Sequence, residues 1–145
     1  MAAINTGRVI VGGLVAGLII NVVEFVMNGI VLAGDMQALY AKMGVVEPGS
    51  GAMVGFVLVG FVLGLLLAWL YAAVRPRLGA GPKTAAVAAL VLWLGAGLVP
   101  IAGWMLMGIY PMRLGIIGLV YSLVEFLIAG QAAGAMYQEG AAPAR

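Results

Sequence analysis

Gly13-Leu-Val-Ala-Gly17-Leu-Ile-Ile-Asn21-Val-Val-Glu24-Phe-Val-Met-Asn28-Gly29 is an apolar stretch that contains one carboxyl group and two amides. On a helix, Gly13, Gly17, Asn21, Glu24 and Asn28 fall within about 80° of one another. The remaining positions are almost all Leu, Val, Ile, Phe or Met. The stretch therefore predicts a helix that is apolar on most sides and carries one narrow stripe of small and polar residues.

The centre of this stretch recurs near the end of the chain. Val23-Glu24-Phe25-Val26-Met27-Asn28-Gly29 corresponds to Val124-Glu125-Phe126-Leu127-Ile128-Ala129-Gly130. Glu24 and Glu125 are the only acids inside apolar segments, so we expect any chemistry to involve them. The match is short and does not by itself establish an inverted duplication.

The residues around Glu125 also form a stripe of small and polar side chains on one side of a helix. Its members are Gly118, Ser122, Glu125, Ala129 and Ala132, with Tyr121 at the edge. Small residues let helix backbones approach closely inside a membrane. We therefore predict that the helices carrying Glu24 and Glu125 pack together along these stripes, with the two carboxyl groups at comparable depth.

Composition decides the class of protein. The chain has 145 residues, 65% of them hydrophobic and 8% charged, with a mean hydropathy of +1.19. A soluble domain carries roughly 25% charged residues, so lipid must solvate much of this chain. A spanning helix needs ~20 residues, and the length therefore fits about four spans. The predicted fold is an all-α, integral membrane, four-helix transmembrane bundle.

Hydropathy and helix breakers give the predicted spans, at about residues 8–33, 51–74, 84–108 and 112–137. Arg8 before an apolar run is also typical of a secretory signal peptide, but that run is long and lacks a convincing cleavage site. A short interfacial helix is expected between spans 1 and 2, begun by Asp35 and ended by Gly44. Arg75–Lys83 should form a tight basic loop, Pro100 should kink the third span, and residues 138–145 should be a disordered cytoplasmic tail.

The basic residues are distributed unevenly between the two ends of such a bundle. With both termini on the side of the basic loop, that side carries Arg8, Arg75, Arg77, Lys83 and Arg145, whereas the opposite side carries Lys42 and Arg113. The positive-inside rule then predicts a multi-pass protein of the bacterial inner (plasma) membrane with both termini in the cytoplasm.

Several classes of function are excluded or disfavoured by residue content. Cysteine and histidine are absent, which removes disulfides, thiolate nucleophiles, the usual haem ligand and most zinc sites. No phosphate loop, Ser/His pair or zinc-protease motif is present. A net charge of +2 does not indicate nucleic-acid binding. We expect a protein that is not an enzyme and that has neither a cofactor nor a metal centre.

Two interpretations of the intramembrane polar residues remain open. Two acids at similar depth are not expected to ionise together, so at least one should hold a proton near neutral pH. A cation or protonatable substrate would then displace that proton. Tyr121 and Trp93 would offer aromatic faces to it, and Ser122 would be a further polar group of the site. Alternatively, Asn21, Glu24 and Asn28 are interhelical hydrogen-bonding groups, Glu24 stays neutral, and Trp93 only packs.

Four short spans with a glutamate in the first resemble, in outline, the small multidrug-resistance transporters. The aromatic motif that surrounds the glutamate of those transporters is not found here, so Glu24 is an analogy and not a motif match. The span count is also similar to that of the membrane-associated eicosanoid and glutathione enzymes, whose intramembrane arginines and glutathione-binding pattern are missing.

The sequence therefore favours a proton-coupled transporter, or binder, of a small cation or solute that uses intramembrane carboxyl groups. We expect the lipid bilayer, a small cation or lipid-like ligand, and a homo-oligomer or larger membrane complex as partners. The alternatives are a non-catalytic accessory or assembly subunit of a larger membrane complex, and a lipid- or quinone-binding membrane protein.

Overall fold

The computed structural model describes residues 4–138, and these residues form helices joined by short turns, with no strand among them. In chain order the elements are α1 (Thr6–Val26), the π-helical η1 (Met27–Val31), α2 (Ala33–Met43), α3 (Ser50–Leu78), α4 (Pro82–Trp93), the π-helical η2 (Leu94–Leu98), α5 (Val99–Leu106) and α6 (Met112–Met136). Apart from Gln138, which follows α6 outside any helix, the predicted tail lies beyond the described residues.

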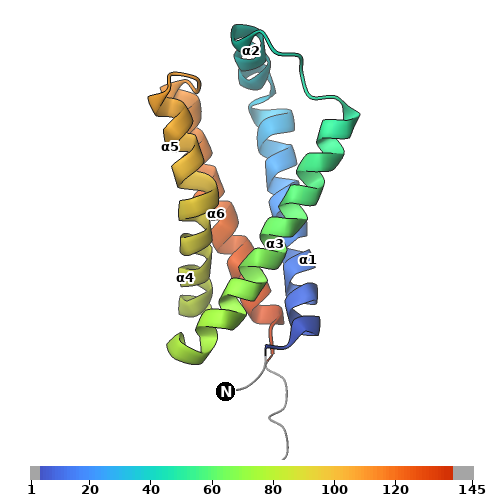
Figure 1. Cartoon of the computed structure of the whole chain (residues 1–145), viewed down its shortest axis with the longest axis vertical. Coiled ribbons are helices and arrows are strands. Elements are labelled where there is room, and N and C mark those ends of the chain that lie inside the picture. Colours follow the sequence, from blue (N-terminus) through green and yellow to red (C-terminus); the bar gives the residue numbers. More distant parts are fainter. Residues whose placement is uncertain (1–3, 139–145) are drawn as a thin grey trace, which may run out of the picture.

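Four helical segments are long and apolar enough to cross a membrane: Thr6–Val31, Ser50–Leu78, Pro82–Leu106 and Met112–Met136. They lie side by side as an elongated bundle (Figure 1). The predicted all-α, four-helix transmembrane fold is thus confirmed, and the chain is a small multi-pass membrane protein.

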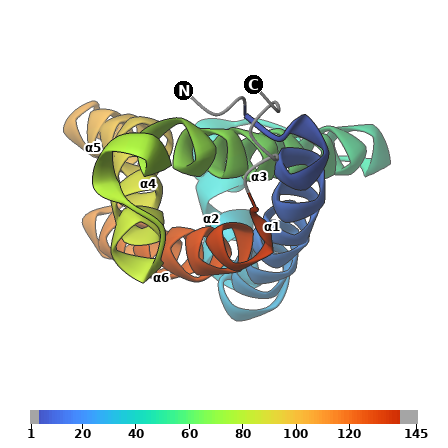
Figure 2. The same cartoon turned by 90° about the horizontal axis from the view of Figure 1, so that it is seen from below.

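The bundle has two different ends. We call the end with the α3–α4 turn the closed end, and it also holds the start of α1 and the last turn of α6 (Figures 1 and 2). We call the opposite end, which holds α2 and the α5–α6 turn, the open end (Figure 1).

A helix is present where the interfacial helix was expected, but Asp35 does not cap it. α2 ends at Gly44, whose φ of 66° is the left-handed conformation that favours glycine. Its N-cap is Leu32, whereas Asp35 lies in the first turn and accepts a 2.7 Å ion-pair hydrogen bond from Arg113. The side chain of Asp35 is therefore engaged by α6, which sequence spacing alone did not reveal.

The basic loop is shorter than predicted. α3 continues through Pro76 to Leu78, so the turn is confined to Gly79–Gly81. The Thr84 hydroxyl closes this turn by donating to Gly79 O at 2.7 Å. Arg75 and Arg77 thus lie in the last turn of α3, where a positive charge complements the helix dipole.

The irregularity expected at Pro100 is found one turn earlier, as η2. Proline cannot donate a backbone hydrogen bond, and its ring collides with the carbonyl four residues before it. The wider π turn replaces the regular pattern there, and Val99 N–H donates to Leu94 O. A similar π turn, η1, ends the first span, with Leu32 N–H donating to Met27 O at 2.7 Å.

Glycines set the crossing of α1 and α3. A Cβ added at Gly64 would overlap backbone atoms of Gly13 and Gly17, and one added at Gly17 would lie 2.8 Å from Phe61 Cα. Backbone contact of this kind is the expected use of small residues in membrane helices. α1 also packs on α6, as the two stripes predicted. The closed half of the bundle is consequently packed backbone against backbone.

Candidate functional site

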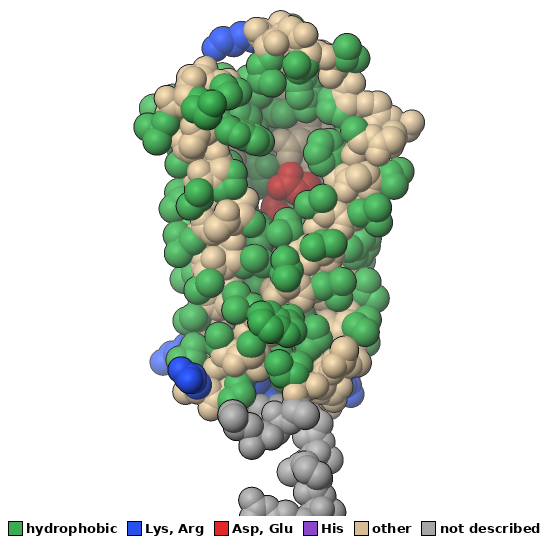
Figure 3. Space-filling model, viewed as in Figure 1, with side chains coloured by type: hydrophobic (Ala, Val, Ile, Leu, Met, Phe, Trp, Pro, Cys, Tyr) green, Lys and Arg blue, Asp and Glu red, His purple; other side chains and the backbone are tan. Residues whose placement is uncertain are grey.

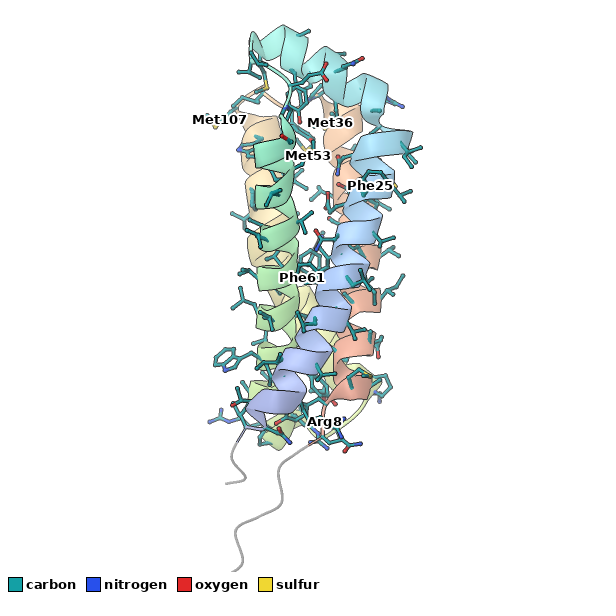
Figure 4. The ribbon with its side chains drawn as sticks, turned by 90° about the vertical axis from the view of Figure 1, so that its right-hand side faces the viewer. Arg8, Phe25, Met36, Met53, Phe61 and Met107 are labelled. Atoms are coloured by element: carbon teal, nitrogen blue, oxygen red, sulfur yellow. The ribbon has the colours of Figure 1, made fainter. Side chains whose placement is uncertain are left out.

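The side chain of Asn21 marks the level at which α1 and α3 part. Its Nδ2 donates to Val57 O across the helix pair at 3.2 Å and to Gly17 O at 2.8 Å. Beyond this level every α3 residue from Ser50 to Val59 is exposed. Figure 4 shows the two helices close together near Phe61 and apart at the level of Met53. Asn21, one of the predicted site residues, is thus a contact between helices.

A hollow opens between the helices beyond that crossing. Figure 3 shows it between α3 and α5, with hydrophobic walls and acidic atoms at its floor. Of the acids in the described residues, only Glu24 and Glu125 lie in spans, whereas Asp35 is in α2 and Glu47 is in the following connection. The acidic atoms at the floor of the hollow therefore belong to this carboxyl pair, of which Glu24 is partly exposed and Glu125 is buried.

The carboxyl group of Glu24 is held by groups from α1 and α6. Asn28 lies one turn further along α1, and its Nδ2 donates to Glu24 Oε2 at 2.5 Å and to Tyr121 OH at 3.1 Å. The Tyr121 hydroxyl lies 3.4 Å from Glu24 Oε2 and 3.5 Å from Oε1, long distances for O–H donation. Glu24 is only partly buried, so it faces the hollow while remaining hydrogen-bonded.

Glu125 is placed differently. Its side chain is 1% exposed, and among the described residues neither carboxyl oxygen receives a hydrogen bond from a donor group of the chain. The carboxyl group of Glu24 lies beside it, on the facing span. Two neighbouring carboxylates in an apolar setting repel each other, so we expect at least one proton on the pair.

Trp93 and Ser122 form a second pair beside the carboxyl groups. The indole Nε1 of Trp93 donates to Ser122 Oγ at 3.0 Å, and this hydroxyl donates to Leu119 O at 3.3 Å. Ser122 lies on the same face of α6 as Glu125, one turn away. A Cβ at Gly97 of η2 would lie 2.8 Å from the indole ring. Gly97 is thus a site residue that sequence reasoning missed, because nothing in the sequence marks the π turn.

The predicted site residues fall into three groups. Glu24, Asn28 and Tyr121 form one hydrogen-bonded cluster between α1 and α6, and the buried carboxyl group of Glu125 lies beside it. Trp93 and Ser122 join α4 to α6 next to it. Asn21 binds the backbone of α3 and has no hydrogen bond to the cluster among those of the described residues.

The charged groups near the open end do not pair with the carboxyl cluster. Arg113 is engaged with Asp35, and both side chains are exposed to solvent. The pKa of Tyr110, in the α5–α6 turn, is raised by burial and further by the charges of Tyr40 and Glu24, so its hydroxyl stays neutral at physiological pH. No ion pair joins Glu24 or Glu125 to a lysine or arginine within the part of the chain that the structure describes. The carboxyl pair is therefore free to balance the charge of a cation.

Residues 4–138 contain no group of three or more histidine, cysteine, aspartate or glutamate side chains close enough to hold a metal ion. The chemistry that the cluster itself offers is an exchangeable proton on a carboxyl pair, beside a hydroxyl and an amide. Comparisons of the chain with protein-family models, with curated proteins and with solved structures gave no match.

Proposed function

We propose that this chain is a membrane carrier that exchanges a proton for a small cationic solute at the Glu24–Glu125 pair. The observation that carries the proposal is the position of the pair at the floor of a hollow that opens between α3 and α5, with Glu24 partly exposed and Glu125 buried beside it. Carboxyl groups placed at this depth are costly, and such residues usually mark a path for ions, protons or ligands.

The exchange balances as follows. The pair starts with a shared proton, and a cation entering the hollow lies against the carboxylate that remains when this proton leaves for water. Binding of one monovalent cation therefore releases one proton, and the net charge of the site is unchanged. Glu24 is the group exposed to the hollow, and Glu125 is the buried partner that retains the proton until the cation arrives.

Proton release is the direct test of this exchange. Purified protein in a weakly buffered solution near neutral pH should release protons saturably when a suitable cation is added from a panel of alkali, alkylammonium and quaternary ammonium ions. Glu24→Gln and Glu125→Gln proteins should fold and release none. Glu47→Gln is the matched control, because it makes the same chemical change at an exposed position outside the spans. Equal release from all variants, or none from well-folded wild type, would contradict the proposal.

Transport requires the closed end to open in turn. In the structure this end is held by Tyr137, whose hydroxyl accepts from Asn5 N–H at 3.2 Å and whose ring lies 5.9 Å from that of Tyr71. Proteoliposomes with an imposed pH gradient should accumulate the cation that releases protons in solution. A protein that exchanges protons in solution but accumulates no cation in response to the pH gradient is a binding protein and not a carrier.

The orientation in the membrane belongs to the same proposal. The basic residues of the closed end favour the cytoplasm for that end and, with it, both termini. The chain has no cysteine, so single-cysteine variants report accessibility without background. In intact cells, a membrane-impermeant maleimide should label Lys42→Cys and leave Lys83→Cys unlabelled until the cells are opened. The reverse pattern would overturn the orientation and leave the exchange site untouched.

An accessory or assembly subunit is the second candidate. It is favoured by the part of α3 from Ser50 to Val59, whose residues are all exposed, and by Asn21, which bonds to the backbone of α3. A stable partner should then co-purify from native membranes in fixed ratio, and its recovery should not depend on Glu24. The hollow itself is formed by helices of one chain, so self-association is not needed to build it.

A further inference from the structure

The structure adds a statement about the ligand to the proposed function, on which this inference rests. We infer that the cation exchanged at Glu24 and Glu125 is a protonated alkylamine, with N–H groups at its head and an apolar chain behind it. Two independent features of the hollow lead to this class: the hydrogen-bonding state of the carboxyl oxygens at its floor, and the chemistry of its walls.

The floor lacks hydrogen-bond donors. Glu125 is almost fully buried, and both of its carboxyl oxygens are without a donor group among the described residues. Glu24 receives one short bond from Asn28 and only long ones from Tyr121. Leaving buried acceptors without donors is costly, and charge-assisted hydrogen bonds are the strongest that these oxygens can form. A head group with several N–H donors supplies what the site lacks.

The nearby polar groups do not favour a cation without N–H donors. The indole N–H of Trp93 is engaged with Ser122, and the only cation–π contact between described residues is at the closed end, where Arg75 lies 5.5 Å from the ring centre of Tyr137. A quaternary ammonium ion would neutralise the charge of the pair but would leave the oxygens of Glu125 without a donor. The floor therefore discriminates between cations by their N–H groups.

The walls favour an apolar chain. The α3 wall from Gly51 to Val59 has no polar side chain, and its part from Gly51 to Val57 rises about 9 Å above the level of Asn21. Figure 3 shows hydrophobic side chains on both sides of the hollow, which opens sideways between α3 and α5. A hydrophilic cation would lose its hydration at this depth with no apolar contact in return. An alkyl chain would lie along the wall or reach into lipid through the side opening.

Three matched probes separate the contributions of head and tail. Octylamine has both features, octyltrimethylammonium keeps the tail and lacks N–H donors, and ethylamine keeps the head and lacks the tail. Wild-type protein in lipid nanodiscs is titrated with each, and proton release is recorded after subtraction of the signal from Glu24→Gln nanodiscs. The subtraction removes protons released when an amphiphile merely dissolves in lipid.

Octylamine should show saturable, one-proton release at the lowest concentration. Octyltrimethylammonium should need an at least about tenfold higher concentration for half-maximal release, since it cannot make the charge-assisted hydrogen bonds. Shortening the alkyl chain should raise the concentration for half-maximal release by about fourfold for each methylene that the hollow or lipid no longer buries. Glu125→Gln, which lacks the buried carboxyl group, should release no protons with either octyl probe.

The outcomes distinguish this inference from the proposed function. Equal half-saturation for the two octyl probes, or for ethylamine and octylamine, would overturn the inference, while proton release in those titrations would still support cation exchange at Glu24. Proton release by alkali ions alone would also overturn the inference, would still support cation exchange at Glu24, and would point to a hydrophilic substrate. No release by any cation from folded protein would overturn the proposed function, and the inference with it.

Discussion

The two halves of this bundle use the same kinds of residues in opposite ways. In the closed half, glycines of α1 and α3 bring the two backbones into contact, and tyrosine hydroxyls are bonded to the backbone of chain segments that they hold together. In the open half, glycines of α3 face open space, and polar side chains surround a carboxyl pair that the chain does not supply with enough donors. The comparison suggests that the closed half provides stability and the open half provides a place to bind.

The largest expected effect comes from adding one methyl group in the closed half. Gly64→Ala places a Cβ against the backbone of Gly13 and Gly17, which cannot move aside as a flexible side chain can. Overpacking of this kind should lower the free energy of unfolding by about 3 kcal/mol. Thermal unfolding in mild detergent, followed by circular dichroism, measures the change.

Gly55→Ala is the matched control, because it makes the same substitution on the same helix in the open half. A Cβ there meets nothing within 4 Å. Alanine should stabilise the helix by up to about 1 kcal/mol through its higher helix propensity. Similar destabilisation at both positions would show that the two halves do not differ in packing as the structure indicates.

The next effect concerns the buried carboxyl group. Glu125→Met replaces a group without donors by an apolar side chain of similar volume, so the protein should gain about 1 kcal/mol of stability. The same change should abolish proton release, because Glu24 loses its partner. A gain in stability together with a loss of function would mark Glu125 as a residue kept for chemistry. Lower stability with unaltered proton release would instead support a structural role for Glu125.

How far the sequence predicts this site depends on which interactions are local. The stripe on α1 and its counterpart on α6 follow from helical periodicity, so the pairing of Glu24 with Glu125, and the positions of Asn28 and Tyr121 beside them, were within reach of the sequence. Ala89, Ala96 and Gly103 recur every seven residues, a spacing that predicts a close seam between helices, but the structure shows open space beside the Cα of Gly103. Periodicity therefore identified faces more reliably than it identified their partners.

The hollow itself was not predictable. It exists because α3 crosses α1 at Gly60 and Gly64 and then diverges. A row of small residues in the sequence predicts neither which helix will pack against it nor the crossing angle. The two π turns were also missed, because hydrophobic patterns are interpreted with a regular helical period. The Asp35–Arg113 ion pair joins residues far apart in the chain and depends on the arrangement of whole helices.

The smallest expected effect comes from two tyrosines on or next to α6, one in each half. Tyr137→Phe removes the hydroxyl that accepts from Asn5 N–H at 3.2 Å and leaves a partly buried backbone donor without its partner, so it should cost about 1 kcal/mol of stability and leave proton release unchanged. Tyr121→Phe removes a hydroxyl that accepts from Asn28 but lies 3.4–3.5 Å from the Glu24 oxygens, so it should cost less than about 0.5 kcal/mol. Its effect should instead appear in the cation concentration needed for half-maximal proton release, since Asn28 and Glu24 lose their common neighbour at the edge of the hollow. Unfolding and proton-release titrations of both variants measure these effects. The stability loss should be larger for Tyr137→Phe, and the change in half-maximal concentration should be larger for Tyr121→Phe. If Tyr137→Phe alters exchange as much as Tyr121→Phe does, the two halves are coupled, and the closed end takes part in the binding step that our proposal places in the open half alone.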